Sequence, residues 1–117
     1  MSISNGKERD FTRDTNYFYS VRENIVNQFK RYQTPKKTVG ELYKSAQKHY
    51  QLTQNGKTDE ATRIINQWLS KDKKLAPVLA TMTQYLREAS QEAGSDSGKR
   101  KGWHDALKYA VKEYKPQ

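Results

Sequence analysis

Hydrophobic residues recur at intervals of three and four along most of this chain, which is the period of an amphipathic α-helix. The stripes occupy five stretches, at about residues 15–32, 38–53, 58–69, 77–93 and 103–114. No stretch shows the two-residue alternation of a half-buried strand. The pattern therefore predicts an all-α protein, a single-domain bundle of about five amphipathic helices joined by short connections.

The apolar positions of each stripe are the expected core residues. They are Phe18, Val21, Ile25, Phe29 and Tyr32; Val39, Leu42, Tyr43, Ala46, Tyr50 and Thr53; Ala61, Ile64, Ile65, Trp68 and Leu69; Val78, Leu79, Met82, Tyr85, Leu86, Ala89 and Ala93; and Trp103, Ala106, Leu107, Ala110, Val111 and Tyr114. The helical period accounts for most tyrosines as packing residues. Tyr19 and Tyr109 lie off the stripes, so they are the better candidates for stacking on unpaired bases.

Local signals mark the expected helix ends. Thr38 begins an S/T-x-x-E capping box at the start of the second helix, and Thr58 is the expected N-cap of the third. Pro35 cannot continue the first helix, and Gly56 suits the position after the second. Pro77 fits the first turn of the fourth helix. These residues divide the chain into its predicted elements.

Two segments are expected to lie outside the helices. Residues 1–13 are polar and mixed in charge, and are expected to form an arm before a helical domain over residues 14–117. Residues 94–102, GSDSGKRKG, have the composition of a flexible loop. This loop is not a phosphate-binding Walker A motif, because the glycine spacing is one residue short and Arg100 replaces the metal-binding hydroxyl. A helix, rather than the required strand, also precedes it.

The polar faces of the predicted helices are rich in cations. The chain has 22 Lys and Arg against 13 Asp and Glu, a formal net charge of +9. Residues 30–50 alone carry six cations and a single acid, Glu41. This balance favours a polyanionic partner, and nucleic acid is the commonest one. Anionic lipid, an acidic protein surface and simple solubility charge are the alternatives.

The candidate phosphate contacts are cations on the expected outer faces and in the basic loop. They are Lys30, Arg31, Lys36, Lys37, Lys44, Lys48, Lys99, Arg100, Lys101, Lys108 and Lys112. Lys44 and Lys48 are one helical turn apart, and like charges at that spacing cost about a few tenths of a kcal/mol. Because this repulsion between Lys44 and Lys48 is left uncompensated, the spacing points to an external anion. Lys30 and Arg31 have an equally good alternative role at the negative end of the first helix dipole.

Catalytic and metal-binding signatures are missing from the sequence. The chain has no cysteine, and neither His49 nor His104 has a metal-ligand spacing. No G-x-S-x-G or G-x-G-x-x-G motif occurs. A helix-turn-helix is disfavoured because its connector would be too long, and because Asp59 and Glu60 would meet the phosphates first. We therefore expect no cofactor, no metal ion and no catalytic residues.

Together these features favour a non-catalytic basic helical subunit that binds RNA or DNA through the phosphate backbone, with little sequence preference and with RNA or single-stranded DNA favoured. Such proteins often work beside other protein subunits in a larger ribonucleoprotein. The small helical subunit of a CRISPR effector complex, which serves antiviral defence, is an analogous role by class alone.

Two other functions stay open. One is a protein-binding adaptor or inhibitor, phage- or plasmid-encoded, whose basic face docks on an acidic protein surface. The other is an enzyme whose site is assembled from residues far apart in the sequence. The N-terminus has no apolar run typical of a signal peptide, and no run approaches the ~20 residues needed to span a bilayer. We therefore expect a cytoplasmic protein with no membrane partner.

Overall fold

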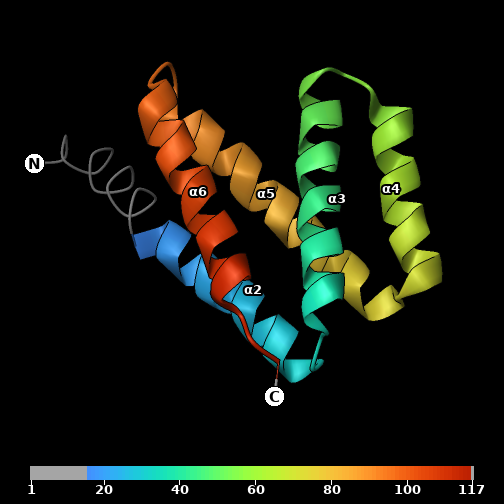
Figure 1. Ribbon diagram of the computed structural model, residues 1–117. Helices are drawn as coiled ribbons and strands as arrows, with labels where there is room; N and C mark the ends of the chain where they lie inside the picture. The colour runs from blue at the N-terminus through green and yellow to red at the C-terminus, as the bar shows by residue number, and fades with distance from the viewer. Residues whose placement is uncertain (1–15, 117) are drawn as a thin grey trace, which may run out of the picture.

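The computed structural model describes residues 16–116, which form five α-helices and one short 3-10 helix (Figure 1). The α-helices are α2 (Phe18–Arg31), α3 (Lys36–Gln54), α4 (Thr58–Lys71), α5 (Ala76–Ala93) and α6 (Ser97–Glu113), and the 3-10 helix η2 (Lys73–Leu75) joins α4 to α5. Within these residues there is no strand. The predicted all-α helical bundle is confirmed. The predicted N-terminal arm, residues 1–13, lies outside the described residues.

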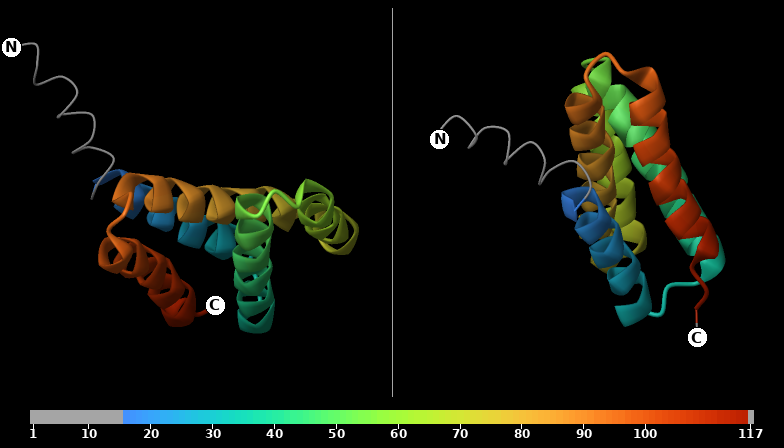
Figure 2. Two further views of the ribbon diagram at one scale, coloured as in Figure 1. Left: turned by 90° about the horizontal axis from the view of Figure 1, so that it is seen from above. Right: turned by 90° about the vertical axis from the view of Figure 1, so that its left-hand side faces the viewer.

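α5 is the central helix of the bundle, because it packs against α2, α3, α4 and α6. Figure 2 shows α2 running beside α5, with α3 and α6 projecting from the same side of α5 and α4 at its far end. All residues predicted to face the core from this helix are buried: Val78, Leu79, Met82, Tyr85, Leu86, Ala89 and Ala93. The most regular apolar stripe of the sequence thus belongs to the helix around which the others pack.

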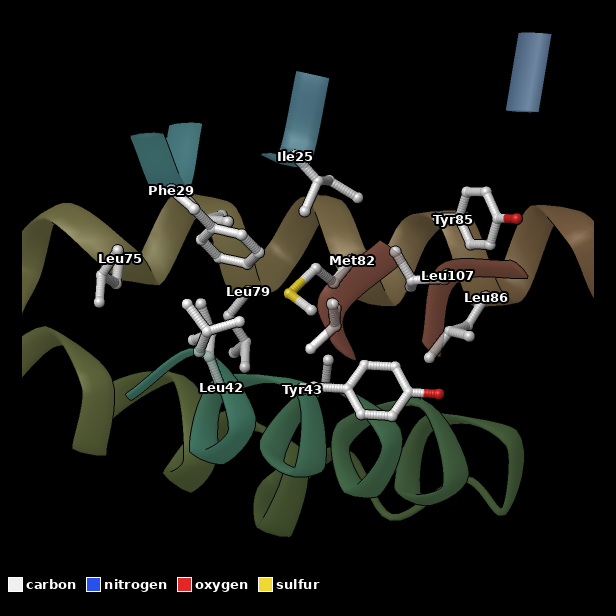
Figure 3. Packing of buried hydrophobic residues seen from close by; sticks show 14 of the residues in the cluster. Ile25, Phe29, Leu42, Tyr43, Leu75, Leu79, Met82, Tyr85, Leu86 and Leu107 are labelled. Carbon is white, nitrogen blue, oxygen red and sulfur yellow. The ribbon is translucent and has the colours of Figure 1, made fainter. Parts of the chain in front are cut away.

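Side chains from the five α-helices and η2 meet in one hydrophobic core around α5, part of which is drawn in Figure 3. The labelled residues are Ile25 and Phe29 of α2, Leu42 and Tyr43 of α3, Leu75 of η2, Leu79, Met82, Tyr85 and Leu86 of α5, and Leu107 of α6. The Tyr85 ring is buried, and its hydroxyl donates to the carbonyl of Trp103 at 2.7 Å. Burial raises the pKa of Tyr85 to about 12. Its ring therefore fills the core while its polar end is satisfied by the start of α6.

The predicted caps of α3 and α4 are wrong. α3 begins at Lys36 after an extended Pro35 (φ −62°, ψ 148°), so Thr38 already lies within the helix and makes no cap. Pro35 is the N-cap, three residues before Thr38, and its carbonyl accepts the first helical hydrogen bond from the Val39 N–H. The N-cap of α4 is Lys57, and Thr58 is the first helical residue. In neither helix does a side chain of the N-cap residue accept a hydrogen bond.

The prediction of a flexible loop at residues 94–102 is also wrong. Gly94 ends α5 with φ 59°, as expected, but α6 begins only three residues later at Ser97. The Asp96 carboxylate caps this helix by accepting from the Lys99 backbone N–H at 2.9 Å. This N-cap outweighs the low helix propensity of the glycines. The consecutive cations of the segment therefore stand on the first turns of a helix.

One predicted core residue lies on the surface. Leu69 of α4 is 46% exposed, whereas Ala61 and Trp68 of the same helix are buried. α4 is at the edge of the bundle, so only a narrow stripe of it meets the core. Leu52 of α3, which the stripe did not include, is buried.

Candidate nucleic-acid interface

Positive charge is concentrated on α3 and α6. α3 has four lysines and one acid, and α6 has five Lys and Arg and two acids, so each carries a net charge of +3. α4 has two cations and two acids, and α5 has one cation and two acids, which makes them neutral and −1. Residues 1–15 contain three charges of each sign. The whole net charge therefore belongs to the described part of the chain, and two thirds of it to two helices.

These two helices are fixed together at one end by Lys36, the first residue of α3. Its ammonium donates to the backbone carbonyls of Val111 at 3.1 Å and Tyr114 at 2.6 Å, and also to that of Lys112. These carbonyls lie at the C-terminus of α6, where the helix dipole is negative and a cation is stabilising. Lys36, a predicted phosphate contact, is thus placed in a contact between α3 and α6.

A second contact joins α3 and α6 further along. The rings of Tyr50 and His104 meet edge to face with centroids 5.5 Å apart. Ser90 of α5 connects them, because its Oγ lies 2.6 Å from the Tyr50 hydroxyl and 3.1 Å from His104 Nε2. The two most cationic helices are therefore held in a defined arrangement on α5.

The outward face of α3 carries three exposed lysines. Lys37 and Lys44 are seven residues apart and Lys48 follows after four more, so their side chains leave the same side of the helix. None of the three makes an ion pair with an acid of the described chain. The predicted charge cluster on this helix is therefore present and faces solvent.

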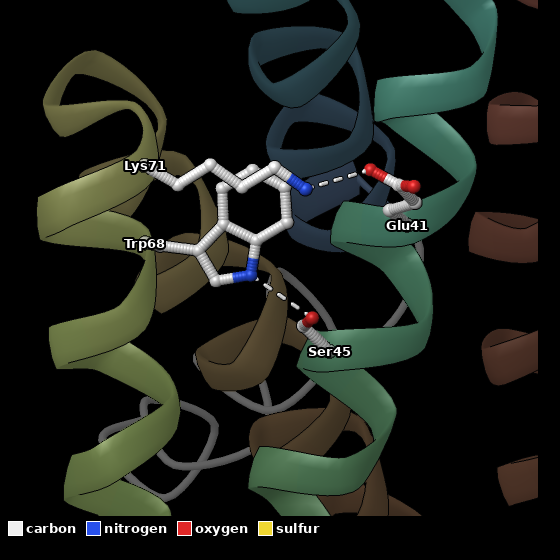
Figure 4. A network of polar contacts seen from close by, with 4 residues as sticks. All are labelled: Glu41, Ser45, Trp68 and Lys71. Carbon is white, nitrogen blue, oxygen red and sulfur yellow. Dashed lines mark hydrogen bonds and ion pairs between the residues drawn. The ribbon is translucent and has the colours of Figure 1, made fainter.

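Figure 4 shows that the one acid of α3 is directed toward α4. The Lys71 ammonium lies 3.0 Å from Glu41 Oε1 and 4.9 Å from the centroid of the Trp68 ring. The Trp68 Nε1–H donates to Ser45 Oγ at 2.9 Å. The hydrogen bond from Lys71 is the main cause that lowers the pKa of Glu41. Glu41 is engaged with α4, and no lysine of α3 forms an ion pair with an acid among residues 16–116.

The lysines of α6 divide into paired and unpaired groups. Lys101 lies 2.7 Å from Asp105 Oδ2, one helical turn away, and this hydrogen bond lowers the pKa of Asp105. Lys108 and Lys112 are exposed and make no such pair within the described residues. Burial raises the pKa of Tyr43 on α3, and the carboxylate of Asp105 raises it further. α6 packs against α3 on this side.

The first cations of α6 contact groups of their own chain. The Lys99 ammonium lies 4.9 Å from the centroid of the Trp103 ring. Arg100 is half-buried and donates from Nη1 to the carbonyl of Gly94 at 3.1 Å. The structure therefore gives both of these predicted phosphate contacts a role at the start of the helix.

Lys30 and Arg31 are neighbours in sequence but not on the surface. Consecutive residues leave a helix about 100° apart. Lys30 follows Val26 by one turn, and Val26 lines a recess that α2 forms with α6. Arg31 shares its side with Gln28, which lines a pocket between α2 and α5. Only Lys30 therefore turns toward the helices that carry the lysines described above.

Six predicted residues share three properties: exposure, no ion pair within the described residues, and a place on α3, on α6 or on the side of α2 that faces α6. We call this set the cationic face: Lys30, Lys37, Lys44, Lys48, Lys108 and Lys112. The other five predicted residues, Arg31, Lys36, Lys99, Arg100 and Lys101, point elsewhere or are engaged within the protein.

Arg22 is a residue that the sequence reasoning missed. Its guanidinium carbon lies 5.3 Å from the centroid of the Tyr19 ring, and its Nε is buried with no hydrogen-bond partner in the described part of the chain. Their three-residue separation on a helix was the available signal, because such side chains are neighbours. Arg22 brings a cation against one of the two tyrosines that lie off the apolar stripes.

Residues 16–116 contain neither a metal-binding cluster nor a membrane-spanning helix. No group of three or more His, Asp or Glu side chains is placed there to hold a metal ion. None of the helices described is both long and apolar enough to cross a bilayer. The chain matches no protein-family model, no curated protein and no solved structure. The cationic face is therefore the feature of this structure that indicates a function.

Proposed function

We propose that this protein is a non-catalytic subunit that binds RNA or DNA through the phosphate backbone, with little preference for base sequence. The observation that carries the proposal is the cationic face, six exposed lysines with no ion pair in the described chain. Ammonium groups of this kind bind phosphates electrostatically and carry no information about the bases. We place the protein in a cytoplasmic ribonucleoprotein alongside other protein subunits, and the cysteine-free sequence is in keeping with that location.

The spacing within the cationic face supports a bound polyanion. Lys44 and Lys48 are one turn apart and repel each other, and the nearby carboxylate of Glu41 is hydrogen-bonded to Lys71 instead. A phosphate between the two ammonium groups would remove this repulsion. The six lysines come from three helices that pack on one core, so the fold sets their relative positions before a strand binds.

The salt dependence of binding tests this function. If six lysines neutralise about six phosphates, the logarithm of the association constant should fall against the logarithm of salt concentration with a slope of roughly −4 to −5. The measurement is fluorescence anisotropy of labelled single-stranded and duplex oligonucleotides at several salt concentrations. A flat response, or no binding at low salt, would contradict the proposal.

An acidic protein partner would use the same lysines, so the purified protein needs a second measurement. After nuclease treatment, the absorbance ratio at 260 and 280 nm reports retained nucleic acid, and mass spectrometry identifies retained proteins. An acidic protein that stays bound, together with no affinity for oligonucleotides at low salt, would replace the proposed function with that of an adaptor.

A further inference from the structure

Two tyrosines stand on the surface without any role in the core. Tyr19 of α2 is 55% exposed and Tyr109 of α6 is 63% exposed. Leu69 is the third large hydrophobic residue that is exposed in the described part of the chain. Tyr43, Tyr85 and Tyr114 are buried. The exposed pair therefore differs from the tyrosines that the helical period assigns to packing.

The two exposed tyrosines belong to helices that run side by side in the same direction. Phe18 packs on Trp103 with ring centroids 4.9 Å apart, and Phe29 packs on Tyr114 at 5.5 Å. Both pairs are separated by the same 85 residues in sequence. This offset places Tyr19 level with residue 104, so Tyr109 lies five residues further along, a rise of roughly 7 Å. The two rings therefore lie at successive levels along the paired helices α2 and α6.

A recess lies between α2 and α6 beside Tyr19. Its volume is about 90 Å³, and it is lined by Tyr19, Arg22, Glu23, Val26 and Ala110. Pockets that enclose a small molecule usually measure about 300–1,000 Å³. The recess is too small for that, so a ligand at this place would lie across its mouth and contact the exposed Tyr19 ring.

The Tyr19 ring is held in place from one side. The Arg22 guanidinium lies 5.3 Å from its centroid, and the Tyr19 hydroxyl donates to Glu23 Oε2 in a long hydrogen bond of 3.4 Å. A ring that is fixed at its edge and on one face, and is still half exposed, presents its other face to solvent. A flat apolar group can stack there at little cost in side-chain entropy.

We infer that Tyr19 and Tyr109 stack on two unpaired bases of a single strand whose phosphates lie along the cationic face. This inference rests on the proposed function and deepens it, because it names single strands as the preferred partner. Lys112 is three residues from Tyr109 on α6, so a base on the ring and a phosphate on this lysine would be neighbours. Stacking on aromatic side chains tolerates any base sequence. Bases in a duplex are already stacked on one another and cannot use the rings.

The test compares Y19A, Y109A and the double variant with the unmodified protein. Affinities are measured at one salt concentration for a mixed-sequence single strand of about 15 nucleotides and for the matching duplex. Each alanine should weaken single-strand binding about tenfold, and should leave duplex binding within about twofold. The exposure of both rings means that these variants fold, which thermal melting verifies.

Two sets of controls separate stacking from other effects. Y19F and Y109F keep the rings without the hydroxyls and should bind like the unmodified protein. L69A removes a comparably exposed apolar side chain from α4, which has no net charge, and should change neither affinity. A loss with the phenylalanine variants equal to that with alanine would assign the effect to the hydroxyls and overturn the inference.

The outcomes distinguish this inference from the function on which it rests. If the alanine variants bind both oligonucleotides as before, while the steep salt dependence persists, the stacking inference is wrong and the proposed function stands. An equal loss for single strand and duplex also overturns the inference, because stacking requires unpaired bases. If the unmodified protein binds neither oligonucleotide, the proposed function fails and the stacking role fails with it.

Discussion

The helices α3 and α6 are amphipathic like α4 and α5, but of these four only α3 and α6 carry a net positive charge. All four bury an apolar stripe in the core. α4 balances its cations with Asp59 and Glu60, which suit the positive end of its dipole. α3 and α6 each keep a net charge of +3. Since α4 packs in the same bundle without a net charge, folding does not require the positive charge of α3 and α6. Binding of an anion is a sufficient reason for that charge.

Charge reversal on α3, compared with reversal near α4, gives the largest expected effect. The variant K44E/K48E should weaken oligonucleotide binding roughly 100-fold at low salt, because it removes two phosphate contacts and adds two repulsive charges. The variant K57E/R63E makes the same change in net charge at exposed positions outside the cationic face. It should weaken binding by less than about fivefold. Fluorescence anisotropy measures both affinities.

Thermal melting should show both reversal variants folded, since all four side chains are exposed. Equal losses of affinity in the two variants would mean that only the total charge matters. The contrast between the two pairs of helices would then have no functional meaning.

Lys36 and Lys37 allow a comparison between a lysine that is engaged within the protein and an outward lysine at the next position. K36M removes the ammonium that caps the C-terminus of α6 and should lower the free energy of unfolding by about 1–3 kcal/mol. K37M removes an outward ammonium that has no ion pair in the described chain, so it should leave stability unchanged and weaken oligonucleotide binding a few-fold. Urea unfolding and anisotropy measure the two quantities. An unchanged stability in K36M would show that α3 and α6 do not depend on this contact.

The sequence predicted well what depends on one helix at a time. The buried stripe of α5 follows from the helical period, and the glycine that ends this helix follows from its own conformational freedom. The prediction of helix starts from the sequence failed where two local signals compete. Pro35 starts α3 before Thr38 can cap it, and Asp96 starts α6 within a segment whose glycines suggested a loop.

The composition of the candidate site was only partly predictable, because several of its cations are engaged by partners on other elements. The Lys36 ammonium binds carbonyls about 75 residues away, and the Lys71 ammonium binds Glu41 across 30 residues. Helical periodicity shows which side of its own helix a lysine occupies. It contains no information about which other helix lies beside that lysine.

The two charged helices also differ from α4 and α5 in their histidines. α3 carries His49 and α6 carries His104, both half-buried, and neither α4 nor α5 has a histidine. Burial is the main cause that lowers the pKa of each, with a smaller contribution from Arg87 for His49 and from Arg100 for His104. A hydrogen bond from His104 Nε2 to the Leu86 carbonyl, 3.0 Å long, opposes the shift.

The smallest expected effect is therefore a decrease in the free energy of unfolding in mild acid, caused by His49 of α3 and His104 of α6. A histidine whose folded pKa lies below the ordinary value of about 6.5 binds fewer protons when folded than when unfolded. Its stabilising contribution is complete above that value and is lost as the pH falls below it. Glu41 and Asp105 also have lowered pKa values, but their contributions are lost only below about pH 4.

The free energy of unfolding should thus decrease from pH 7 to pH 5 in the unmodified protein, as measured by urea unfolding at each pH. H49Q/H104Q should remove this decrease, since glutamine does not titrate and its amide can still donate to the Leu86 carbonyl. E41Q is the matched control and should retain the decrease, because Glu41 stays ionised over this range. Equal stability at pH 7 and pH 5 in the unmodified protein would show that neither histidine resists protonation in the fold.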